Sequence, residues 1–111
     1  MIHIIREGVT DEQMSEMSEQ LEGYVKLAVD VRRDVLAGGG ALHADCEAVL
    51  LEDGSAQADI WGADWIPSTQ EVTYEALINL RPGQGNLALE VQDPALREQI
   101  AAVVRRLLGG V

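Results

Sequence analysis

The sequence predicts an α+β fold: a mostly antiparallel sheet of four to five strands with two or three helices packed on one face. Residues 24–31 alternate apolar and polar side chains, as a half-buried strand does, and residues 58–66 and 72–81 are predicted as two further strands. The stretch after Asp93 instead repeats apolar side chains at helical spacing. The expected order is strand, helix, hairpin, helix, hairpin, helix, which favours helices on one face of an antiparallel sheet.

The first half of the chain carries clear local signals. Residues 2–6 form an expected strand, and Thr10 with Gln13 forms a capping box that begins a helix ending by Gly23. Residues 24–31 and the short returning strand 35–37 form an expected hairpin, which three consecutive glycines end.

Residues 43–53 are open to two interpretations. Asp45 can cap a helix that ends near Gly54, or Asp53 and Gly54 can form the turn of a hairpin. The alanines and acidic residues before Val49 are poor strand formers, so the helix is favoured.

The second half ends in the clearest helix of the chain. The two expected strands 58–66 and 72–81 are joined by a turn that begins at Pro67. Asp93 is a natural N-cap and Pro94 suits the first turn, while two arginines lie near the helix C-terminus.

Length and composition predict one globular domain that spans residues 1–111. Apolar residues make up 47% of the chain, enough for a core in a domain of this length. The single cysteine, Cys46, leaves no internal disulfide, and the apolar start of the chain is cut short by Arg6. We therefore expect a cytoplasmic protein with no signal peptide and no membrane span.

The formal net charge of −11 limits the classes of partner. Phosphate backbones and anionic membrane surfaces repel such a protein, so we expect no nucleic-acid partner and no membrane partner. Acidity of this kind keeps a small protein soluble, and it also favours cations or basic partners.

The segment from Asn79 to Asn86 is one candidate site. Arg81 carries a planar fork that suits a carboxylate or phosphate, and a loop with two glycines and Gln84 follows it. This predicts a site for a small anionic ligand. Alternatively, Arg81 pairs with an aspartate (Asp30, Asp59 or Asp64) and locks the loop in place.

A second candidate lies around His43, where four residues with reactive or ligating side chains follow one another. On a helix His43 and Glu47 share a face, so both can bind one metal ion if an aspartate such as Asp30 joins them. Cys46 with His43 suggests a thiol nucleophile. The simpler interpretation is that Asp45 caps a helix and Cys46 is a small core residue.

Four short segments together resemble a family of short prokaryotic proteins classed as a domain of unknown function. They are Gly39–Asp45, Leu50–Ser55, Asp59–Gly62 and Asn79–Pro82, the last followed by Gly85 and Asn86. The resemblance spans nearly the whole chain and implies no particular chemistry. Unlike the family pattern, the loop then continues with leucines rather than basic or hydroxyl residues, which suggests that they face a partner.

Three functions follow from these observations. The first is a binding or interaction module that self-associates as a homodimer through a sheet face or the Leu87–Leu89 edge. The second is a small-ligand binder or small enzyme, and the third is a metal-binding protein. The sequence identifies no catalytic residue, no cofactor and no complete metal-ligand set. The residues of the second hypothesis are Asp30, His43, Asp45, Asn79, Arg81, Gln84 and Asn86.

Overall fold

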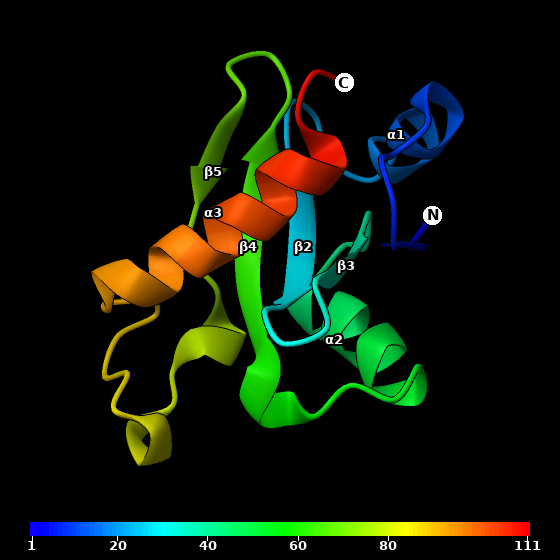
Figure 1. Ribbon diagram of the computed structural model, residues 1–111. Coiled ribbons are helices and arrows are strands. Elements are labelled where there is room, and N and C mark those ends of the chain that lie inside the picture. The colour runs from blue at the N-terminus through cyan, green and yellow to red at the C-terminus, as the bar shows by residue number, and fades with distance from the viewer.

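A computed structural model describes residues 1–111 and shows one five-stranded sheet with three helices (Figure 1). Every neighbouring pair of strands is antiparallel, and the order across the sheet is β1-β3-β2-β4-β5. The predicted α+β class and antiparallel sheet are confirmed. The strands are β1 (His3–Ile5), β2 (Val25–Asp30), β3 (Val35–Gly38), β4 (Ile60–Ile66) and β5 (Glu71–Thr73); the helices are α1 (Asp11–Met17), α2 (His43–Glu52) and α3 (Pro94–Leu108).

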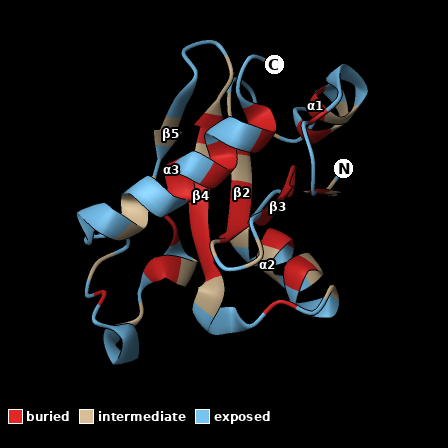
Figure 2. Ribbon diagram, in the orientation of Figure 1, coloured by how far each residue is buried: buried red, intermediate tan, exposed pale blue.

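The two faces of the sheet are covered by different helices. Leu27 on β2 belongs to a large apolar cluster with side chains of α1 and α3, and Figure 1 shows α3 lying across β2 and β4. Its neighbour Ala28 points to the other face, where it packs with Cys46 and Leu50 of α2. The expectation that helices share one face therefore holds for α1 and α3, whereas α2 covers the opposite face. β2 is buried on both sides as a result (Figure 2).

Helix α3 forms as its sequence predicts. The carboxylate of Asp93 accepts a hydrogen bond from the backbone N–H of Ala95 at 2.9 Å, and Pro94 occupies the first turn. Its apolar face is buried against the sheet, and its opposite face is exposed (Figure 2). No helix in the structure has both the length and the apolar composition that a membrane crossing needs.

Helices α1 and α2 differ in how they begin. In α1 the capping box is present, with Thr10 and Gln13 bonding each other's backbone N–H at 3.1 and 3.0 Å. The favoured helix interpretation of residues 43–53 is confirmed by α2. Asp45 is not its cap, however, because the helix begins two residues earlier and the N-cap position is held by Leu42 without a side-chain hydrogen bond.

The predicted strand 72–81 ends at Thr73, and the rest of the prediction is wrong. The chain there turns over the sheet, and residues 77–79 and 82–84 form two short 3₁₀ turns. Ala76 packs onto β4 at Gly62, where a Cβ atom would lie 2.5 Å from the Cβ of Ala76. The glycine therefore lets a crossing segment take the place of a long edge strand.

Asp53, at the end of α2, holds three parts of the fold together. Its carboxylate accepts hydrogen bonds from Arg6 after β1 at 2.6 Å and from Arg33 in the β2–β3 turn at 2.8 Å. These two guanidinium groups lower the pKa of Asp53 from 3.8 to about 2. Because the folded pKa is the lower one, the ionised carboxylate stabilises the fold above pH 3.8, and this contribution is lost as the pH falls toward 2.

We therefore expect Asp53→Asn to remove part of the acid sensitivity of folding. Urea unfolding across this pH range measures it: the parent loses stability as the pH falls, and the variant, which has no carboxylate to protonate, loses less. Asp59→Asn is the control, because Asp59 forms no ion pair in the structure. Equal acid sensitivity in the parent and Asp53→Asn would contradict the assignment.

Candidate functional site

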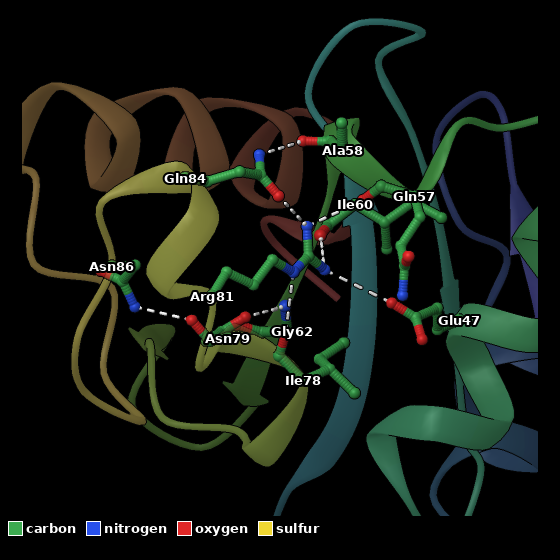
Figure 3. A network of polar contacts seen from close by, with 10 residues as sticks. All are labelled: Glu47, Gln57, Ala58, Ile60, Gly62, Ile78, Asn79, Arg81, Gln84 and Asn86. Carbon is green, nitrogen blue, oxygen red and sulfur yellow. Dashed lines mark hydrogen bonds and ion pairs between the residues drawn. The ribbon is translucent and has the colours of Figure 1, made fainter.

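Arg81 lies at the centre of a polar network that joins the 77–86 loop to β4 and α2 (Figure 3). Its guanidinium stacks over the ring of Trp61, with Cζ 4.5 Å from the ring centroid. All of its N–H groups face acceptors in the chain. Nε donates to the Ile78 carbonyl (2.9 Å), Nη1 to the Gln57 carbonyl (2.8 Å) and Gln84 Oε1 (3.2 Å), and Nη2 to the Ile60 carbonyl and Glu47 Oε2 (3.3 Å).

An arginine side chain has five N–H donors, so this network leaves Arg81 none for an added anion. The side chains of Arg81 and Glu47 are only 10% and 13% exposed. Burial lowers the pKa of Arg81, and the carboxylate of Glu47 opposes that shift. Arg81 thus locks its loop in place, as the alternative interpretation expected, but its partner is Glu47 rather than an aspartate.

The two asparagines of this segment also serve the backbone. The buried Asn79 accepts from the Gly62 N–H at 2.7 Å and donates to the carbonyls of Gly62 and Tyr74 at 2.9 and 3.1 Å. The amide of Asn86 donates to three carbonyls, including that of Asn79 at 2.7 Å (Figure 3). Both side chains supply hydrogen bonds where the sheet ladder stops.

The remaining predicted site residues lie elsewhere. Asp30 is fully buried at the end of β2, where one carboxylate oxygen accepts the N–H groups of Arg32 and Arg33 at 2.9 Å. The other accepts the hydroxyl of Ser55 at 2.6 Å, so Asp30 orders the β2–β3 turn. Asp45 is exposed in the first turn of α2. The structure thus gathers Asn79, Arg81, Gln84 and Asn86 in one network and places Asp30, His43 and Asp45 outside it.

His43 and Glu47, the suggested metal ligands, turn to different partners. The Nε2 atom of His43 lies 2.8 Å from Oδ1 of Asp64 on β4, whereas Glu47 pairs with Arg81. Three or more histidine, cysteine, aspartate or glutamate side chains do not gather anywhere in an arrangement that would hold a metal ion.

His43 lies in the largest of four surface hollows, a groove of about 630 Å³ between the start of α2 and the segments that follow β5. Its base is a row of polar residues on adjacent strands. Lys26 on β2 is opposite Asp64 on β4, and Asp64 is opposite Thr73 on β5. The hydroxyl of Thr73 donates to Asp64 Oδ2 at 3.3 Å, and the Lys26 ammonium donates to the carbonyl of Ala41 at 3.1 Å.

The contacts of His43 define which ring nitrogen carries the proton. Nε2 faces two acceptors, the carbonyl of Ala63 at 3.2 Å and the carboxylate of Asp64 at 2.8 Å. In the neutral ring the proton is therefore on Nε2, and Nδ1 carries the lone pair. No protein group bonds Nδ1. The carboxylate thus orients an imidazole whose second nitrogen is left to accept a hydrogen bond or a proton.

Lys26, Asp64 and Thr73 are neighbours of His43 that the sequence pattern does not predict. Alternation sets Lys26 opposite the apolar face of its strand, and it puts Asp64 on the same face as Ile60 and Gly62. Alternation does not predict the register between strands, and it is this register that puts the three residues in one row.

A protein-family model described as "Protein of unknown function (DUF5674)" matches residues 3–107. The chain belongs to this family. The resemblance predicted from the four sequence segments, to a family of unknown function, is thereby confirmed. Comparison with the curated proteins and with the solved structures finds no match. The DUF5674 match assigns no chemistry, so the functional proposals rest on the groove and its residues.

Proposed function

We propose that this chain is a binding module whose ligand occupies the groove between α2 and the segments after β5. The observation that carries the proposal is the composition of the groove. It combines a volume of about 630 Å³, apolar walls and a polar base around His43 and Asp64. Sites for small molecules have volumes of about 300–1,000 Å³ and are mostly apolar, with a few polar groups that orient the ligand.

Exposed leucines support the same assignment. Leu42, Leu77 and Leu89 line the groove with 57%, 76% and 39% of their surface exposed. They come from distant parts of the sequence and converge on one hollow. Apolar side chains that gather in this way mark an interaction site more often than single exposed leucines do.

Binding is favoured over catalysis by a thiol because the cysteine of the chain does not line the groove. The only cysteine, Cys46, is buried on the sheet side of α2, where its thiol donates to the carbonyl of Lys26 at 3.5 Å. Burial raises the pKa of Cys46, which keeps the thiol protonated. His43 is committed to Asp64 rather than to the thiol, so the two residues do not form a catalytic pair.

Two alanines of α2 allow a direct test of the groove. Ala44 and Ala48 are both exposed, but only Ala44 lines the groove. We expect Ala44→Trp to fill the groove and weaken binding at least tenfold, whereas Ala48→Trp leaves it unchanged. Amide chemical shifts of ¹⁵N-labelled protein, titrated with hexanol, hexanoate and hexylammonium, provide the measurement. If no probe shifts the groove amides, or both variants bind like the parent, the proposal is wrong.

Self-association is a second candidate, favoured by leucines outside the groove. Leu80 and Leu87 are 47% and 69% exposed and do not line it. A homodimer that covers these side chains would remove their apolar surface from water. Sedimentation of the same ligand-free samples over a range of concentrations tests this candidate, because a monomeric mass throughout rules it out.

A further inference from the structure

We propose that the ligand of the groove is a cation, a primary ammonium group carried on an apolar stem. This inference rests on the proposed binding function and adds the chemical class of the ligand. It follows from three features of the groove: its excess of carboxylates, two acceptors that receive no hydrogen bond from the chain, and its leucine walls.

The charges that line the groove are mostly negative. Asp64, Glu75 and Glu90 contribute three carboxylates, and Lys26 is the single lining residue with a permanent positive charge. Glu90 also has a partner on the rim, Arg97, at 3.4 Å. Both of those side chains are well exposed, at 58% and 37%, so the pair compensates little charge. The net charge of −11 adds a field that attracts cations to the whole surface.

The hydrogen-bonding groups of the groove point to the same class. Lys26 donates to a carbonyl, the hydroxyl of Thr73 donates to Asp64, and the Nε2–H of His43 faces Asp64 and Ala63. Each of these three groups thus donates at least once within the protein. The Nδ1 atom of His43 and the carboxylate of Glu75 have no donor from the chain, so they accept from the ligand. An ammonium group supplies three N–H donors and no acceptor, which matches these two acceptors.

The apolar walls require a stem on that ammonium group. Leu42, Leu77 and Leu89 surround the polar base, so a bare metal ion or an ammonium ion would leave them exposed to water. An alkyl chain of about six carbons covers them, and its own methylene groups leave water at the same time. An anionic ligand fits less well, because its charge would face Asp64 and Glu75.

Three probes with one stem and different head groups test the inference. Hexylammonium, hexanol and hexanoate are titrated into the parent protein, and affinity is read from the amide shifts of groove residues. We expect hexylammonium to bind at least tenfold more tightly than hexanoate, with hexanol between them. Added salt should weaken the binding of hexylammonium and leave that of hexanol nearly unchanged.

A pair of glutamate variants separates the groove from the general acidity of the protein. Glu75→Gln removes a carboxylate of the groove, and Glu71→Gln removes an exposed one on β5 that does not line it. We expect the first to weaken hexylammonium severalfold without affecting hexanol, and the second to have no effect. Equal losses in both variants would overturn the inference.

The remaining outcomes distinguish the two proposals. Equal binding of the three probes, or tightest binding of hexanoate, would contradict the proposal of a cationic ligand. It would leave the proposal that the groove binds a ligand intact. If hexylammonium binds but Ala44→Trp does not weaken it, the cation binds outside the groove and the inference is wrong. Absence of any groove shift with all three probes rejects the binding function itself.

Discussion

Replacing Asn79 by leucine is expected to lower the free energy of unfolding by roughly 3–5 kcal/mol, a large part of the stability of a domain this size. Asn79 is fully buried, and its side chain satisfies both the N–H and the carbonyl of Gly62. Leucine has a similar volume but neither donor nor acceptor. The two backbone groups would stay buried without partners, at about 1–3 kcal/mol each, and the carbonyl of Tyr74 would also lose a donor.

Urea unfolding of the parent and of Asn79→Leu measures this loss. Gln84→Leu is the control, because Gln84 also bonds a backbone carbonyl, that of Ala58 at 3.0 Å, but does so at an exposed position. Water replaces that hydrogen bond, so we expect the control to lose less than about 1 kcal/mol. Similar losses of unfolding free energy in the two variants would show that the stabilising effect of Asn79 does not depend on its burial.

Arg81→Lys is expected to lower the free energy of unfolding by roughly 2–3 kcal/mol, although the charge of the side chain is unchanged. Lysine has three donors on one nitrogen and no planar group, so it cannot stack on Trp61 and reach Gln57, Ile78 and Glu47 together. Carbonyls that Arg81 now satisfies would lose their donors. For a domain of this length the melting temperature should fall by roughly 10 °C.

Arg97→Lys is the matched control for this substitution. Arg97 also lies over an aromatic ring, with Cζ 5.2 Å from the centroid of Tyr74, and pairs with a glutamate, Glu90. Its side chain is 37% exposed, against 10% for Arg81, so water compensates for the lost contacts. Thermal unfolding followed by circular dichroism should show a shift several times larger for Arg81→Lys, and equal shifts would contradict the network's role.

Local signals predicted most of the regular elements. The capping box of Thr10 and Gln13, the cap at Asp93 and the alternation along β2 all depend on neighbours in the sequence, and each is present. The strand predicted to continue to Arg81 failed for a tertiary reason. The side chain of Asn79 bonds the backbone of β4, which draws the segment across the sheet instead of along its edge.

The candidate site was predicted only in part. His43 was singled out because imidazole is a versatile group, and it does lie in the main groove. Arg81 was singled out because its fork suits anions, yet the protein itself supplies every acceptor. Residue type reveals what a side chain is able to bind, but its actual partners depend on segments brought together by folding, such as Glu47 of α2.

The sequence by itself determined the α+β class, the positions of the main helices and strands, and membership of a family of unknown function. Only the tertiary structure decided that α2 and α3 cover opposite faces of β2, and that Lys26, Asp64 and Thr73 form one row beneath His43. The reason is physical: alternation and helical period define which side chains share a face of one element. The register and packing between elements depend instead on contacts distant in sequence.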